Sequence, residues 1–394
     1  MKYLLIDGNN LAVRAAFANE DLQNNEGECT SVHFGFNQSL ILLRKRFPDH
    51  RILVAWDGKS KRRMDESREG VNKHLIPSAY KENRDKENLP KPLKDFFSQS
   101  DYLKKAIHQL GIAQIRMPEF EADDVLASYA HYLKDEHEVT ICTSDKDYWQ
   151  LLDDNVILWD GMKMQETTKA DWVAEYGIQP ENAVDVGALM GDNGDNIFGI
   201  PGWGEKTAFK EIKKHETWEK LYEGLHEKYD KLKDKYPDIK DWAETEETKS
   251  GGVDMEKVRD YTFNDLSSIK ANPDNPNSKL KYPGIYSKMP FSGVLEAFEK
   301  GEVKMPKATM MALCFEERVR LAYSLKKMDV IDGLPDIPEY EFNQDKVLDY
   351  FEYYDIHSLM EDIKVFSPDY DGVKVGQGVD ILDVFEGLAT EEVE

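Results

Sequence analysis

Five short apolar runs rich in β-branched residues recur in the first part of the chain, and they constrain its fold more than any other feature. They span residues 3–6, 52–56, 112–115, 139–142 and 156–159. Longer stretches with a helical period separate them, such as 30–46 and 121–133. Because strands alternate with helices, the sequence predicts an α/β fold with a mostly parallel, doubly wound sheet and flanking helices.

Acidic side chains directly follow three of these predicted strands. Asp7 ends the first, Asp57 follows the second, and Asp145 and Asp147 follow the fourth. Open α/β sheets bind their ligands outside the carboxyl ends of the strands. We therefore expect these four carboxylates to converge at one edge of the sheet.

Two further acidic groups lie outside the strands. Glu121, Asp123 and Asp124 open a predicted helix, and Asp192 and Asp195 lie in a glycine-rich segment. One acid alone could be a helix cap or a surface residue. So many carboxylates at one edge repel one another unless cations are bound, and hard cations such as Mg²⁺ prefer oxygen ligands. The set suits two metal ions that clamp the attacking and leaving oxygens of a phosphodiester.

The glycine-rich segment 191–208 (GDNGDNIFGIPGWGEKTA) carries a second signal. Its glycines allow backbone amides to approach a ligand, and a predicted helix follows whose first N–H groups suit a phosphate. This pattern predicts a helix–hairpin–helix that binds nucleic-acid backbone, although an ordinary glycine-rich turn is the alternative. The GxxxxGK[ST] spacing of an ATP-binding loop is missing. The residues concerned are Gly199, Gly202, Gly204, Lys206 and Thr207.

A basic region suggests a nucleic-acid partner despite the net charge of −25. From 44 to 105 the chain has 17 Lys/Arg against 10 Asp/Glu. Within it, residues 58–100, here called the arch segment, are expected to be a mobile excursion from the sheet. Cations bind phosphates and an aromatic ring can stack on an unpaired base, although a charge run is usually only a solvated face. The residues expected to contact DNA here are Lys59, Arg62, Arg63 and Tyr80, with Lys81 and Arg84 nearby.

Composition narrows the class of protein. The three cysteines lie far apart without a CxxC pair, which fits a reducing compartment and gives no thiolate zinc site. We find no secretory signal and no apolar run near the ~20 residues of a membrane span, so we expect a soluble, cytoplasmic protein of a bacterial or phage-infected cell.

The expected domains are an α/β core (1–170), a helix–hairpin–helix region (171–227), a charged, partly disordered insertion (228–305), closing helices (306–365) and an acidic tail (366–394).

These residues resemble the 5′→3′ exonuclease/flap endonuclease family, especially its bacteriophage and bacterial polymerase-associated members. The matching blocks occur in the family's order: LLIDGNNLAVRAAF, LVAWDGKS, YKENR, EFEADDVLASYA, TSDKDYWQLL and GDNGDNIFGIPGWGEKTA. A weaker match covers the segments RLAYSLKKMDVI and LDYFEYYDIHSLM. Residues 228–305 have no obvious counterpart.

The resemblance implies a role for each matched residue. Asp7, Asp57, Glu121 and Asp123 would hold one Mg²⁺ or Mn²⁺, and Asp145, Asp147, Asp192 and Asp195 the other, with Asp124 in the same cluster. Lys81 and Arg84 would contact the scissile phosphate. The arch segment would admit a single-stranded 5′ end, and the hairpin at 199–206 would grip duplex DNA, with K⁺ as a further ion.

The expected substrates are DNA with 5′ ends, flaps or branches, and RNA of RNA–DNA hybrids. The ILDVF sequence of the acidic tail resembles peptides that dock on sliding clamps, although a solubilising tail is the simpler interpretation. Two other readings stay open: a non-catalytic branched-DNA-binding replication scaffold, and a small metal-dependent ribonuclease fold that shares only the sheet acids.

Overall fold

The computed structural model describes residues 1–18, 22–73, 75–84, 88–235, 309, 312–313 and 315–370. The chain divides into two compact units. Unit 1 comprises Met1–Ser60, Asp85–Asp171 and Met328–Glu394, and unit 2 comprises Lys61–Arg84 and Trp172–Lys327. Among the described residues, no helix has the length and apolar character needed to cross a membrane. Most of the expected insertion, from 236 onward, and residues 371–394 of the expected tail lie outside the described residues.

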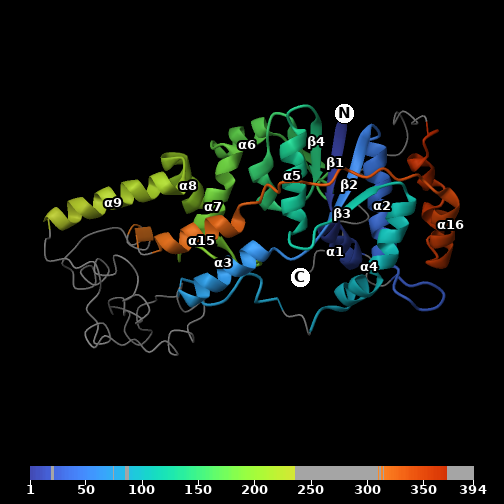
Figure 1. Ribbon diagram of the computed structural model, residues 1–394, viewed down its shortest axis with the longest axis horizontal. Coiled ribbons are helices and arrows are strands. Elements are labelled where there is room, and N and C mark those ends of the chain that lie inside the picture. Colours follow the sequence, from blue (N-terminus) through green and yellow to red (C-terminus); the bar gives the residue numbers. More distant parts are fainter. Residues whose placement is uncertain are drawn as a thin grey trace. The chain divides into compact units, whose positions relative to one another are not determined.

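Unit 1 is built on a six-stranded sheet in the order β3-β2-β1-β4-β5-β6. The first five strands pair in parallel, and the sixth is an antiparallel edge strand. Figure 1 shows the neighbouring strands β2, β1 and β4 at the centre of this unit. The strands are β1 (Lys2–Asp7), β2 (His50–Trp56), β3 (Ala113–Arg116), β4 (Glu138–Cys142), β5 (Val156–Asp160) and β6 (Gln165–Thr167).

Helices cover both faces of this sheet, as its buried strands require. One core cluster joins Leu4, Ile6 and Val54 to apolar residues of the helices α1, α2, α4 and α16. Helix α5 packs against β1, β2 and β4 and contributes none of its residues to that cluster. The helices of unit 1 are α1 (Gly8–Ala18), α2 (Ser31–Arg46), α4 (Lys91–Gln109), α5 (Ala122–Leu133) and α16 (Gln344–Tyr353), with 3₁₀ turns η1 (Lys146–Leu151), η4 (His357–Leu359) and η5 (Asp362–Phe366).

The predicted α/β fold is confirmed, and the five predicted strands all form within one or two residues of their expected bounds. Strand β6 was not predicted, because its Gln-Glu-Thr sequence is short and polar. A mobile excursion was expected at residues 58–100, whereas the described part contains the helix α3 (Lys61–Asn72) and the start of α4.

Unit 2 is mainly helical. Its glycine-rich segment contains a small antiparallel hairpin, β7 (Gly191–Asp192) paired with β8 (Ile197–Phe198). This hairpin and the following loop connect α7 (Ala183–Met190) to α8 (Glu205–His215). The remaining elements are α3, the 3₁₀ turn η2 (Pro180–Asn182), α9 (Trp218–Lys235) and α15 (Glu316–Lys326); α6 (Lys169–Tyr176) begins three residues before the division between the units.

Candidate active site

Asp7 is the last residue of β1 and lies among other acids of unit 1. Its carboxylate accepts hydrogen bonds from the backbone N–H of Asn10 (2.9 Å) and from the hydroxyl of Tyr148 (3.3 Å). Burial and the repulsion from Asp57, Asp123 and Asp145 raise the pKa of Asp7 to about 7, although the Asn10 hydrogen bond opposes this shift. A cation bound to these carboxylates would remove that repulsion.

Asp57 follows β2 and links this strand end to the start of α5. Its Oδ1 atom accepts the backbone N–H of Ala122 at 2.9 Å. Glu121 occupies the N-cap position of α5 but does not cap the helix through its own side chain. The carboxylate of Asp57 therefore supplies an acceptor for one of the N–H groups that a helix start leaves free.

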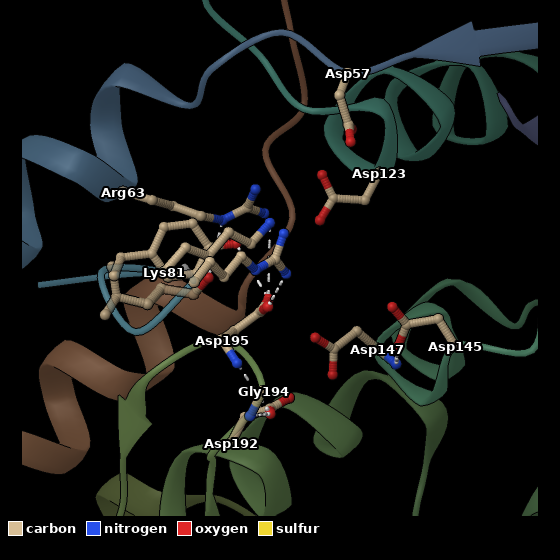
Figure 2. Close-up of polar contacts among 12 residues, drawn as sticks. Asp57, Arg63, Lys81, Asp123, Asp145, Asp147, Asp192, Gly194 and Asp195 are labelled. Carbon is tan, nitrogen blue, oxygen red and sulfur yellow. Dashed lines mark hydrogen bonds and ion pairs between the residues drawn. The ribbon is translucent and has the colours of Figure 1, made fainter. Parts of the chain in front are cut away.

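The three acids at the start of α5 differ in their surroundings. Glu121 is 8 % exposed and Asp123 is half-buried. Figure 2 shows the Asp123 carboxylate next to that of Asp57. Asp124 is fully buried, and its Oδ1 atom accepts the backbone N–H of Asp329 at 2.9 Å. Asp124 therefore anchors the chain that follows α15, a structural use that the sequence prediction of a metal ligand did not anticipate.

Asp145 and Asp147 lie where β4 leads into η1. Asp145 is the N-cap of η1, and its side chain accepts the backbone N–H of Asp147 at 2.9 Å. Both carboxylates thus lie just after the end of β4, as the strand pattern predicted, and Figure 2 shows them next to each other. The structure thus gathers Asp7, Asp57, Asp123 and Asp145 into one electrostatically interacting group at the carboxyl edge of the sheet.

Unit 2 holds the two other predicted metal ligands in the β7–β8 hairpin. Asp192 accepts the backbone N–H of Gly194 at 2.8 Å through Oδ1, and its Oδ2 atom pairs with the Nζ of Lys326 at 2.7 Å. Burial alone would raise the pKa of Asp192, but the charge and hydrogen bond of Lys326 outweigh it and leave the pKa below its usual value. This carboxylate is therefore ionised at neutral pH.

Asp195 is bound by side chains of the arch segment that also belong to unit 2. Its Oδ1 atom lies 2.6 Å from Nη2 of Arg84, and its Oδ2 atom lies 3.8 Å from Nζ of Lys81. The hydroxyl of Tyr80 donates to Oδ2 at 3.3 Å. Figure 2 shows Lys81 directed at Asp195. Tyr80 itself is only 9 % exposed, so its ring is not presented for stacking on a base in this conformation.

Hydrogen bonds to backbone carbonyls also hold the turn at residues 79–84 against the β7–β8 hairpin. The N–H of Lys81 donates to the carbonyl of Asp195 at 3.0 Å, and Nδ2 of Asn83 donates to the carbonyl of Asn193 at 2.9 Å. Asn196 donates from Nδ2 to the carbonyl of Ala79 at 2.5 Å. Lys81 and Asn196 have positive φ angles of 55° and 58°, an uncommon backbone region for residues other than glycine. Such strained positions cluster at functional sites.

Two arginines that were expected to contact DNA are instead used inside unit 2. Arg63 is 1 % exposed, and its Nε atom donates to the carbonyl of Leu325 at 2.9 Å. Arg62 donates to the carbonyls of Ser324 (2.6 Å) and Lys327 (2.9 Å). Both therefore satisfy carbonyl groups that the C-terminal end of α15 leaves free. Because helix α3 packs on α15, Arg63 is too buried to face DNA, whereas the side chain of Arg62 is 28% exposed and its contact with DNA stays a prediction.

The remaining predicted DNA contacts have the exposure that such contacts need, with one exception. Lys59 and Lys206 are exposed, Thr207 is half-buried in the first turn of α8, and Gly202 and Gly204 face open space. Gly199 is packed instead: a Cβ atom there would lie 2.4 Å from the backbone N of Gly191. Because Gly199 has no side chain, its backbone can lie close to the backbone of Gly191.

Comparison with known proteins identifies the family. Residues 2–177 match the family described as 5'-3' exonuclease, N-terminal resolvase-like domain, and residues 178–248 match 5'-3' exonuclease, C-terminal SAM fold. A 5'-3' exonuclease of Bacillus subtilis is 34% identical over 232 residues, which cover 57% of this chain and 74% of the relative. The chain belongs to the 5′-3′ exonuclease family.

The chain is also similar to part of much longer proteins. DNA polymerase I of Thermus thermophilus is 35% identical over 225 residues, and the match spans 57% of this chain but only 25% of that polymerase. Among solved structures, one described as divalent metal ions (zinc) bound to T5 5'-exonuclease has 23% identity and a TM-score of 0.45, with 57% of this chain and 79% of that chain covered.

Sequence reasoning missed two residues of this family member that contact the predicted ligands. Tyr148 lies within the TSDKDYWQLL block, and its hydroxyl contacts Asp7. Lys326 is the last residue of α15 and pairs with Asp192. A lysine gives no sign in sequence that it is buried, so only the fold could reveal its place.

Proposed function

We propose that this chain is a structure-specific, metal-dependent 5′→3′ exonuclease and flap endonuclease that hydrolyses phosphodiester bonds in DNA and in the RNA of primers. The observation that carries the proposal is the group of sheet-edge carboxylates, where burial, together with the repulsion from Asp57, Asp123 and Asp145, raises the pKa of Asp7 to about 7. Membership of the 5′-3′ exonuclease family supports it. A non-catalytic scaffold would have no need of so costly an arrangement of acids.

The carboxylates fit divalent metal ions by their chemistry. In unit 1 the ligands are Asp7, Asp57, Glu121 and Asp123, with Asp145 and Asp147 for a further ion. In unit 2 the ligands are Asp192 and Asp195. Among the described residues, no three acidic, histidine or cysteine side chains are already placed to hold one metal ion. The carboxylates would therefore move closer together when an ion binds. When bound, Mg²⁺ or Mn²⁺ would activate the attacking water and stabilise the leaving 3′ oxygen.

The basic residues of the arch segment would act on the substrate phosphate. Lys81 and Arg84 lie on one turn and both contact Asp195. Arg84 is 54% exposed, so its guanidinium can leave this carboxylate for a phosphate without disturbing a core. There the two cations would offset the charge that develops on the phosphoryl oxygens. The exposed backbone at Gly202 and Gly204, with Lys206 and Thr207, would bind duplex backbone together with K⁺.

A cleavage assay tests the proposal directly. A 5′-flap duplex labelled at either end is incubated with the full chain in Mg²⁺, in Mn²⁺ and in EDTA. We expect metal-dependent release of short 5′ fragments, and the label pattern separates endonucleolytic from exonucleolytic cutting. Asp145→Asn should lower the rate at least about a hundredfold with flap binding retained, whereas Asp135→Asn, at an exposed turn after α5, should cut normally. Tight flap binding without cleavage in either metal would instead support the scaffold.

A further inference from the structure

Lys326 is a buried lysine at the end of α15 with its charge directed at a predicted metal ligand. The residue is 5% exposed, and its Nζ atom lies 2.7 Å from Oδ2 of Asp192. Its aliphatic stem lies over α7, where a Cβ atom on Gly187 would be 3.6 Å from Cδ and Cε of the lysine. A buried ammonium is stable only with a close acidic partner, so this pair is a fixed part of unit 2.

The Asp192 carboxylate is hydrogen-bonded within unit 2 and is also partly exposed to solvent. Lys326 occupies Oδ2, while the N–H groups of Gly194 (2.8 Å) and Asp195 (3.3 Å) donate to Oδ1. The Asp192 side chain nevertheless remains 35% exposed, in contrast to 4% for that of Lys326. A ligand can therefore approach the carboxylate from solvent while the lysine remains in place behind it.

The other carboxylate of this hairpin is held differently. The cations on Asp195 are the exposed Arg84 and the less buried Lys81, whose side chain is 25% exposed. These long side chains can swing away into solvent when another cation or a phosphate arrives. Lys326 has no such freedom because α7 and α15 enclose it. We therefore expect its positive charge to stay beside Asp192 when a ligand arrives.

We propose that Lys326 is a positioning residue that orients Asp192 and, as a permanent cation, weakens the binding of a divalent ion to the Asp192–Asp195 pair. Two positive charges sharing one carboxylate repel, and the repulsion is strong at a partly buried site. The pair would then bind its ion weakly in the free protein and more tightly when substrate phosphate adds negative charge. This inference rests on the proposed metal-dependent function. It deepens that function by making Lys326 a determinant of how tightly one metal ion binds.

The test measures ion binding instead of cleavage. Mn²⁺ is titrated into the full chain without DNA, and free Mn²⁺ is followed by electron paramagnetic resonance. Lys326→Met keeps the stem and removes the charge, and we expect it to tighten the weakest Mn²⁺ binding step at least about tenfold. Lys326→Arg, which keeps the charge, and Lys327→Met, which changes the neighbouring exposed lysine, should stay within about twofold of the unmodified protein.

Each alternative result has a distinct meaning. A folded Lys326→Met protein with unchanged or weaker Mn²⁺ binding and only a lower melting temperature would show a purely structural ion pair and overturn the inference. Should the methionine variant not fold, Lys326→Gln, which keeps a donor toward Asp192 without the charge, is titrated under the same criterion. An unmodified chain that binds no Mn²⁺ at all would count against the proposed function itself.

Discussion

The carboxylate of Asp57 accepts a hydrogen bond from the backbone N–H of Ala122, 2.9 Å away. The end of β2 and the start of α5, which are far apart in sequence, are thereby fixed to each other by an acid that is also a predicted metal ligand. Asp57 thus has a structural hydrogen bond and a predicted role in metal binding, and substitutions can test the two roles separately.

Substitutions of Asp57 should distinguish the structural from the catalytic role. Asp57→Asn keeps an oxygen acceptor for Ala122 and removes a charge that repels Asp7, so its free energy of unfolding should be no lower than that of the original protein while cleavage is lost. Asp57→Ala removes the acceptor and should cost about 1 kcal/mol more. Urea denaturation of both variants measures the difference. Equal stability of the two would show that this hydrogen bond contributes nothing.

Gly58, the next residue, should tolerate no side chain. A Cβ atom there would lie 2.1 Å from the carbonyl oxygen of Met117 and 2.5 Å from that of Phe120, and backbone atoms cannot move aside cheaply. We expect Gly58→Ala to cost at least about 3 kcal/mol, measured by chemical denaturation. Gly161→Ala is the matched control, because its nearest neighbour would be 3.8 Å away. A fully stable Gly58→Ala protein would contradict the packing described for this turn.

Asp185 should make unit 2 less stable as the pH rises. Burial raises the pKa of Asp185 to about 6, although hydrogen bonds from Trp218 and Asn182 oppose the shift. A group with a raised folded-state pKa stabilises the fold below its unfolded value, near 4, and loses that contribution as the pH passes 6. Asp185→Asn should therefore become more stable relative to the original protein between pH 4 and 7, by about 3 kcal/mol at most.

Asp171 provides the contrast for that experiment. Hydrogen bonds from the hydroxyl and backbone N–H of Thr168 lower the pKa of this exposed acid. Its contribution is therefore present at neutral pH and is lost as the pH falls through the folded-state pKa. The stability difference between Asp171→Asn and the original protein should change with pH in the opposite direction. Urea denaturation at several pH values decides both cases, and parallel pH profiles for the two variants would refute the assignment.

Asn196 should control how firmly the turn with Lys81 and Arg84 is held. Its side chain binds Ser78 and Ala79, and its φ angle of 58° favours Asn or Gly. Asn196→Ala should cost about 2 kcal/mol and expose the turn to trypsin. Asn196→Gly loses the same hydrogen bonds but relieves the backbone, so it should be about 1 kcal/mol more stable than the alanine variant. Limited proteolysis measures both, and an unchanged rate of cleavage at Lys81 and Arg84 would be the contrary result.

The sequence allowed the sheet and its acidic edge to be predicted, because both depend on local signals. Strands such as β2 and β4 are short, mostly apolar runs, Asp57 follows β2 directly, and Asp145 lies in the turn just after β4. Contacts between segments far apart in sequence could not be predicted. Arg63 looks like a surface charge until α3 is seen to pack on α15, and nothing in the sequence around Asp124 predicts its hydrogen bond with Asp329.

Unit 1 draws its core from segments that are far apart in the sequence. Val347 and Phe351 of α16, with Ile363 after it, belong to the same apolar cluster as Leu4 and Ile6 of β1. During synthesis the first strand therefore leaves the ribosome long before the residues that complete its core. A chain that stops short of α16 would keep apolar surface of α4 uncovered and be prone to aggregation. Folding of unit 1 is thus tied to translation reaching α16 and η5.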